Sequence, residues 1–91
     1  MKELRYTGQF KKDLKRFLNQ PRKLIALNEV LEMLRNEMAL PQKYRAHTLT
    51  GNYVGCMECH IDGDFLLIWI DEEQNSIALL RLGSHSELFK K

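Results

Sequence analysis

The run FLLIWI at residues 65–70 decides the fold of this chain. A short, nearly continuous apolar run predicts a central strand, here over residues 64–71, which helices cover on one face. The dipeptide Asp62-Gly63 before it suits a tight hairpin turn, so residues 52–60 are expected to form the partner strand. A third strand is expected over residues 76–82. These segments predict a small, mostly antiparallel sheet.

Apolar residues at helical spacing predict two helices before these strands. The stripe of the first helix is Phe10, Leu14, Phe17 and Leu18. The second helix is expected to begin at Pro21 and to be stopped by Pro41, with a buried seam of Leu24, Leu27, Leu31, Leu34 and Met38. With a short strand at residues 4–6, the order is β-α-α-β-β-β. We therefore expect one α+β domain over residues 1–91, with both helices on one face of the sheet and the opposite face open for a site.

The charge of the chain is divided unevenly between its halves. Residues 1–46 hold eleven Lys/Arg and five Asp/Glu, a net charge of +6, whereas residues 47–91 hold three and seven, a net charge of −4. The basic cluster is either a solvated helix face or a surface for a nucleic-acid backbone; its members are Lys11, Lys12, Lys15, Arg16, Arg22 and Lys23. No apolar run approaches the roughly 20 residues of a membrane span, and the N-terminus lacks the apolar core of a secretory signal. We expect a cytoplasmic protein.

Side chains suited to RNA cleavage gather in the second half of the chain, and they include all three histidines: His47, His60, Asp64, Arg81 and His85. Imidazoles titrate near neutrality, a carboxylate accepts a proton or orients an imidazole, and a guanidinium grips a phosphate with two donors. This set supplies what phosphodiester cleavage without a metal requires. Taken singly, a histidine at a strand end is usually a solvated or structurally bonded residue, and Arg81 could extend from the sheet into solvent.

Residues 56–60, CMECH, match the C-x-x-C-H haem attachment signature. Within a strand, however, Cys56 and Cys59 point to opposite faces, whereas a haem box normally opens a helix. The same separation argues against a zinc site built from the two thiols and His60. We expect no metal or cofactor and two small, partly buried cysteines. Glu58 shares a strand face with His60, and could either orient that histidine or form a cross-strand ion pair.

Three sequence motifs indicate a family resemblance: LPQKYRAHTLTGNYVG, ECHIDGDFLLIW and LLRLGSHSELF. In this order, with YTGQFKKDLKR before them, they resemble the YafQ branch of the RelE superfamily of bacterial type II toxins. The resemblance implies a RelE-like fold and a ribosome-dependent endoribonuclease that cuts mRNA in the decoding site. It also implies inhibition by a DinJ-like antitoxin, through which the complex binds operator DNA. The site positions of the family match His47, His60, Asp64, Arg81 and His85, with aromatic positions at Phe65 and Phe89.

The chemistry of RNA suggests a role for each of these residues. The ribose 2′-OH is the nucleophile, so the protein has to remove its proton, stabilise the phosphorane and protonate the leaving 5′-oxygen. Arg81 is the candidate for the phosphorane charge, and His85, on a short mobile tail, for the general acid. Asp64 or His60 is the candidate base, and His47 either positions phosphate or shares that role. An aromatic ring, Phe65 or Phe89, could stack on a base or belong to the core. Lys11, Lys12, Lys15 and Arg16 are candidates for binding the RNA backbone.

The chain departs from the family pattern at three positions, and these leave two other functions open. Met57 stands where relatives more often carry arginine, Gly63 where proline is usual, and Cys56 where an aromatic residue is commoner. The departures leave the candidate catalytic set intact. One alternative is inhibition by binding, as the ParE branch inhibits DNA gyrase. The other is an inactive relative that survives as an antitoxin partner and co-repressor.

Overall fold

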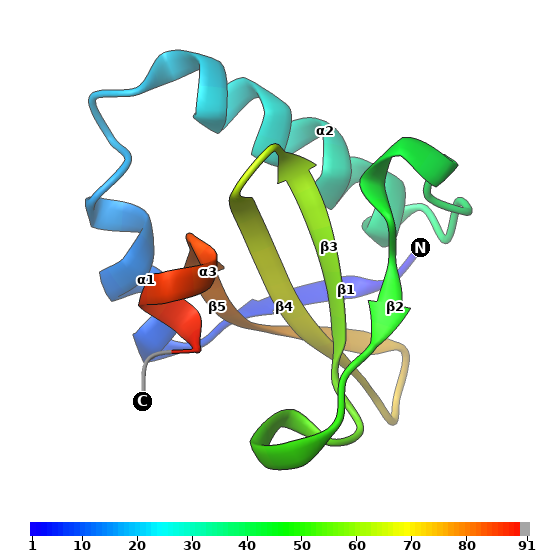
Figure 1. The fold of residues 1–91 in the computed structure, drawn as a ribbon. Helices are drawn as coiled ribbons and strands as arrows, with labels where there is room; N and C mark the ends of the chain where they lie inside the picture. The colour runs from blue at the N-terminus through cyan, green and yellow to red at the C-terminus, as the bar shows by residue number, and fades with distance from the viewer. Residues whose placement is uncertain (90–91) are drawn as a thin grey trace.

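The computed structural model describes residues 1–89, in which a five-stranded sheet carries helices on both faces (Figure 1). Its strands are β1 (Glu3–Tyr6), β2 (His47–Thr48), β3 (Met57–Asp62), β4 (Phe65–Glu72) and β5 (Ser76–Gly83). Its helices are α1 (Gly8–Lys15), α2 (Pro21–Arg35) and α3 (His85–Leu88), with 3₁₀ turns η1 (Gln42–Tyr44) and η2 (Gly51–Tyr53). The strand order is β1-β5-β4-β3-β2, and only β1 and β5 are parallel. The expected α+β class is confirmed, while β2 and α3 were not predicted. No helix within residues 1–89 is long and apolar enough to cross a membrane.

Strand β4 occupies the middle of the sheet, as expected, and both of its faces are buried. Phe65, Leu67 and Trp69 point into the core formed with α1 and α2. Leu66 and Ile68, each 0% exposed, lie on the opposite face beneath α3 and the segment that contains η2. A strand covered on both sides needs no polar alternation, which explains the continuous apolar run. The expectation that this second face would be open was therefore wrong over β4.

Helix α1 is anchored at its start by Thr7 and ends before the predicted apolar stripe is complete. The Thr7 Oγ1 atom accepts a hydrogen bond from the Phe10 amide at 3.2 Å and donates one to the Leu79 carbonyl at 2.7 Å. This cap therefore docks the helix on β5. Leu18, which was placed in the stripe, follows the end of the helix and is 62% exposed. The helical spacing no longer applies there.

Helix α2 begins at Pro21, as predicted, but ends at Arg35 rather than at Pro41. The side chain of Asn36 donates a hydrogen bond to the carbonyl one turn back, at 2.8 Å, and so satisfies one of the last carbonyls of the helix. Met38, expected in the buried seam, lies beyond this end and is 59% exposed. The proline is therefore not the stop signal.

The β3–β4 hairpin turns one residue later than predicted. Its loop residues are Gly63 and Asp64, and Asp62 pairs with Phe65 across the turn. Gly63 has a φ of +59°, a left-handed conformation that glycine adopts without a Cβ penalty. The shift matters because it places Asp64 at the tip of the hairpin rather than in the strand.

The predicted strand over residues 52–60 begins only at Met57. Gly51 and Gly55 have φ values of +70° and +90°, which are incompatible with an extended strand. The segment between them instead forms η2 and carries Tyr53 onto the face of the sheet opposite α1 and α2. This loop becomes part of the candidate site.

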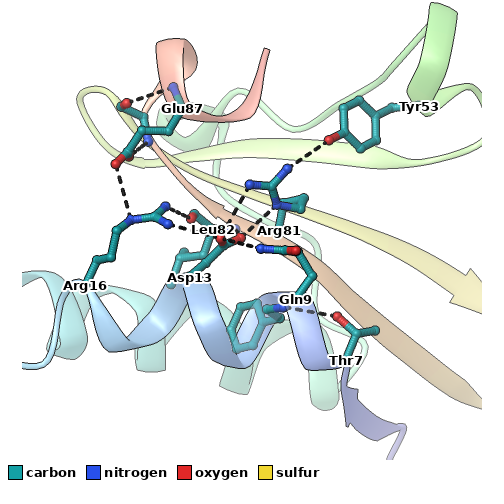
Figure 2. Close-up of polar contacts among 10 residues, drawn as sticks. Thr7, Gln9, Asp13, Arg16, Tyr53, Arg81, Leu82 and Glu87 are labelled. Atoms are coloured by element: carbon teal, nitrogen blue, oxygen red, sulfur yellow. Dashed lines mark hydrogen bonds and ion pairs between the residues drawn. The ribbon is translucent and has the colours of Figure 1, made fainter. Parts of the chain in front are cut away.

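Helix α1 replaces β1 along the last part of β5. The parallel pairing runs from Glu3 opposite Ser76 to Tyr6 opposite Leu79. Beyond it, the Leu82 amide donates to Asp13 Oδ2 at 2.9 Å, and the Leu82 carbonyl accepts from Arg16 Nη2 at 3.3 Å (Figure 2). These two side chains pair with backbone groups that an open strand edge would expose.

Candidate active site

The register of the sheet places three of the predicted residues on one face, opposite α1 and α2. His47 pairs with Glu58, Glu58 with Ile68, and Ile68 with Arg81, so these residues form a row across four strands. Neighbouring strands lie about 4.8 Å apart, so the row spans about 14 Å of backbone. His60 lies on the same face in the next row, opposite Leu66. The candidate site residues form two groups, one at the β2–β3 end of these rows and one at the β3–β4 hairpin, while Arg81 lies at the other end of the first row.

The first group consists of His47, His60 and the buried Glu58. His47 Nε2 lies 3.2 Å from Glu58 Oε1, and His60 Nε2 lies 3.9 Å from the same atom. The carboxylate is 2% exposed, and its Oε2 atom has no hydrogen-bond partner within the described residues. Of the two roles considered for Glu58, the cross-strand contact to His47 is the shorter one. The buried Glu58 side chain thus contacts both histidines on the sheet surface.

The second ring nitrogens of the two histidines face backbone carbonyls. His47 Nδ1 lies 2.8 Å from the Arg45 carbonyl, and His60 Nδ1 lies 3.4 Å from the Gly63 carbonyl. In each ring both nitrogens therefore lie near oxygen atoms, which orients the two rings on the sheet surface. The ring centroids are 6.3 Å apart.

The second group joins the tip of the β3–β4 hairpin to α3. The His85 amide donates a hydrogen bond to Asp64 Oδ1 at 2.9 Å, and the His85 ring lies 4.9 Å from that of Phe89. The predicted mobile tail is instead a short helix with a capping box. Ser84 Oγ accepts from the Glu87 amide at 3.3 Å, and the Ser84 amide donates to Glu87 Oε1 at 2.7 Å. Ser84 and Glu87, three positions apart, are the sequence signal for this helix.

Arg81 is held rather than free. Its Nε donates to Asp13 Oδ2 at 2.8 Å, its Nη2 to Asp13 Oδ1 at 3.4 Å, and its Nη1 to the Tyr53 hydroxyl at 3.3 Å (Figure 2). Asp13 is fully buried and also accepts hydrogen bonds from the Leu82 amide and from Gln9. Burial alone raises the pKa of a carboxyl, but these hydrogen bonds outweigh it and lower the pKa of Asp13. The same pairing raises the pKa of Arg81.

Sequence reasoning missed Asp13 and Tyr53. The available signal was the position of Asp13 three residues after Phe10, on the apolar stripe of α1, where a carboxylate must find partners if it is buried. No comparable signal marked Tyr53, because its placement depends on the loop at η2. The two residues hold Arg81 from opposite sides.

The candidate RNA-binding residues have different surroundings. Phe65 is 2% exposed and packs against Phe17 with ring centroids 4.8 Å apart, so it belongs to the core and has no free face for a base. Phe89 is partly exposed, with its ring 5.6 Å from that of Tyr53. Of the basic residues, Arg16 contacts Asp13, Glu87 and the Leu82 carbonyl. The remaining three are exposed on α1: Lys11, Lys12 and Lys15.

The sequence matches, over residues 2–90, the family described as "Bacterial toxin of type II toxin-antitoxin system, YafQ". This chain belongs to that toxin family. The "mRNA interferase toxin YafQ" of Escherichia coli strain K12 is 28% identical over 89 residues, which cover 97% of this chain and 96% of that protein. A metal-bound toxin from Helicobacter pylori has a TM-score of 0.88 and 39% identity, covering 98% of this chain and 100% of that one. The E. coli DinJ–YafQ complex has a TM-score of 0.84 and 28% identity, covering 98% and 99% of the two chains. The predicted family and RelE-like fold are confirmed.

The two cysteines of this YafQ-family chain lie on opposite faces of the sheet, as predicted. Cys59 is buried in the core with α1 and α2, and Cys56 in the cluster on the other face. Burial, with the nearby Glu58 charge, raises the pKa of the Cys59 thiol to about 12, and burial also raises the pKa of Cys56. A thiol that stays protonated is a poor metal ligand and a poor nucleophile. Neither the haem nor the zinc interpretation fits this placement.

Proposed function

We propose that this chain is an endoribonuclease that cleaves mRNA on the ribosome and that a DinJ-like antitoxin inhibits it. The observation that carries the proposal is the common sheet face. It carries His47 and His60 at one end and the Arg81 guanidinium at the other, across about 14 Å of backbone, and this spacing supports contact with one RNA strand. The name of the E. coli relative, an mRNA interferase, and the structure of the E. coli DinJ–YafQ complex support the same activity and the same class of partner. Operator DNA is reached only through the antitoxin complex.

In the proposed mechanism, the 2′-OH of the substrate attacks the adjacent phosphorus. Asp64 or His60 removes its proton, Arg81 stabilises the charge on the phosphorane, and His85 protonates the leaving 5′-oxygen. The products are a 2′,3′-cyclic phosphate, or the 3′-phosphate formed when it opens, and a 5′-OH. His47, held by Glu58, positions the phosphate or shares in the proton transfer. Because acid, base and cation are all side chains, we propose that no metal takes part.

The hydrogen bond between Asp64 and the His85 amide gives this scheme a geometric basis. It ties the hairpin tip, which carries one candidate base, to the first residue of α3, which carries the candidate acid. Phe89, one turn further on, presents a partly exposed ring on which a base could stack. The candidate acid and the candidate stacking ring therefore lie side by side, with ring centroids 4.9 Å apart.

The exposed lysines of α1 are proposed to bind the ribosomal RNA backbone. Lys11, Lys12 and Lys15 lie on a helix whose buried side faces β5, and so they project away from the sheet. Their contribution is a phosphate affinity that weakens with salt. Arg16 is removed from this set, because its guanidinium already contacts Asp13 and Glu87.

The proposal is tested by inducible expression in bacteria with mapping of mRNA ends by primer extension. We expect growth arrest, new mRNA 5′-ends within translated regions, and rescue when the antitoxin is co-expressed. The matched control is His85→Ala, which changes an exposed side chain and should produce no new ends. Growth arrest without new ends would support inhibition by binding instead. Elemental analysis that finds one zinc per purified chain would overturn metal independence.

A further inference from the structure

Within residues 1–89, the hydrogen bonds of Arg81 leave one edge of its guanidinium without a partner. A guanidinium carries five N–H donors in a planar fork. Asp13 takes the edge formed by Nε and Nη2, and the Tyr53 hydroxyl oxygen accepts from Nη1 (Figure 2). The two remaining donors lie on Nη1 and Nη2, the second edge of the fork, which can grip the two oxygens of a phosphate.

The Tyr53 hydroxyl lies beside that free edge and has a proton to donate. Its oxygen accepts from Arg81 Nη1 at 3.3 Å, so the hydroxyl hydrogen is directed away from the guanidinium. The Tyr53 ring is partly exposed and meets the Phe89 ring at 5.6 Å, with the planes inclined at 81°. An edge-to-face contact of this kind fixes where the hydroxyl lies. A hydroxyl that is polarised by a cation and held in place is a good donor to an anion.

These donors open into a pocket that can hold a nucleotide. The pocket has a volume of about 710 Å³ and is lined by Thr50, Asn52, Tyr53, Arg81, Glu87, Leu88 and Phe89. Its lining combines two phosphate donors with an aromatic ring and polar side chains from the η2 loop. The carboxylate in the lining, Glu87, is paired with Arg16 and with the Ser84 amide, so its charge is partly compensated.

We propose that Tyr53 is a further catalytic residue, whose hydroxyl donates a hydrogen bond to the scissile phosphate beside Arg81. The inference rests on the proposed function, because it names the group that shares phosphate binding with Arg81. Charge on the phosphate oxygens grows in the transition state, so the hydroxyl acts more on the rate of cleavage than on the affinity for RNA.

The test is Tyr53→Phe, which removes only the hydroxyl and keeps the ring contact with Phe89. In single-turnover cleavage of ribosome-bound mRNA at saturating protein, the rate should fall roughly 10- to 100-fold, the equivalent of one hydrogen bond to a charged group. Ribosome affinity should stay within about twofold, as expected for an interaction made mainly in the transition state. The matched control is Tyr6→Phe, on β1 outside this pocket, which should leave the rate unchanged. A wild-type rate for Tyr53→Phe would overturn the inference while leaving the proposed function intact.

A second comparison separates contact with the phosphate from simple orientation of Arg81. In an Arg81→Lys background, which keeps a cation but loses the fork, adding Tyr53→Phe should still slow cleavage at least several-fold, because the hydroxyl itself binds phosphate. If the second change has no effect in that background, Tyr53 acts only through Arg81 and the inference is wrong.

A measurement that does not depend on cleavage completes the test. Inorganic phosphate is titrated while the Arg81 Nε–H resonance is followed by NMR. Because its dianion carries more charge than a phosphodiester, as the transition state does, it should bind wild type and Tyr6→Phe alike and Tyr53→Phe several-fold more weakly. Equal phosphate affinity in all three proteins would overturn the site. If the wild-type protein does not cleave mRNA but the three proteins show these phosphate affinities, the phosphate site is supported and the proposed function is wrong.

Discussion

Replacing Asp13 by asparagine should destabilise the fold by about 3 kcal/mol at pH 7, the low end of the roughly 3–5 kcal/mol lost when a buried ion pair is broken. Asp13 is fully buried, and its carboxylate accepts from Arg81 and from the Leu82 amide at 2.8 and 2.9 Å. Asparagine keeps the size but turns one acceptor into a donor that faces other donors, and it removes the charge opposite Arg81. A domain of this length has a free energy of unfolding of about 5–14 kcal/mol, so the variant should still fold.

Urea unfolding followed by circular dichroism measures the loss, and its pH dependence tests the cause. The pKa of Asp13 is lowered in the folded state, so its stabilisation is fully present above the unfolded value of about 3.9 and is lost as pH falls through the folded pKa. The difference between wild type and Asp13→Asn should therefore shrink below about pH 4. Glu72 also has a lowered pKa, caused mainly by its hydrogen bond with Arg5, and it cancels in the difference because Asp13 does not act on it.

The control for this prediction is Asp71→Asn, which removes a carboxylate paired with Lys2 at 2.8 Å on the surface. An exposed pair of this kind contributes little to stability, so the free energy of unfolding should change far less than in Asp13→Asn. Equal losses in the two variants, or a difference between wild type and Asp13→Asn that stays constant from pH 7 to pH 3, would refute the reasoning.

Three further predictions concern the proposed site. His85→Ala should slow single-turnover mRNA cleavage by roughly 10²–10⁴-fold with little change in ribosome binding, and a variant that mainly weakens binding would contradict its role as general acid. Changing Lys11, Lys12 and Lys15 together to glutamine should weaken ribosome association and flatten its salt dependence while the saturated rate stays nearly intact, measured by filter binding at several salt concentrations. Cys59, with its pKa raised to about 12, should resist iodoacetamide at pH 8 in the folded protein and react in urea, and rapid labelling without denaturant would show that the thiol is not buried as described.

The sequence predicted the central strand and the shared face of the site because both depend on local alternation. The apolar run FLLIWI indicated a central strand, although the prediction covered only one of its faces and the structure buries both. The period of two in β3 separates Cys59 from Glu58 and His60. Spacing misled beyond the helix ends, where Leu18 and Met38 are exposed because neither residue lies within its helix.

What could not be predicted depends on tertiary contacts. No sequence pattern near Tyr53 indicates that its hydroxyl accepts a hydrogen bond from Arg81, 28 positions later in the chain. Phe65 could be core or a stacking ring, and only the packing of Phe17 against it decides for the core. Asp13 is also set by distant groups, since Arg81 and the Leu82 amide make its burial possible. The role of such polar residues is determined by hydrogen-bond partners that are distant in the sequence.

The parallel pairing of β1 with β5 determines when the protein can first act during its own synthesis. Residues 3–6 join residues 76–79, so the first strand waits for almost the whole chain before it can dock. Contacts between residues so far apart in the sequence form slowly, because the entropy cost of closing a long loop comes before the contacts stabilise the fold. Arg81 lies on the same late strand and takes its orientation from Asp13, which emerges far earlier. A ribosome translating this chain therefore carries an incomplete sheet and an unassembled site until β5 has emerged.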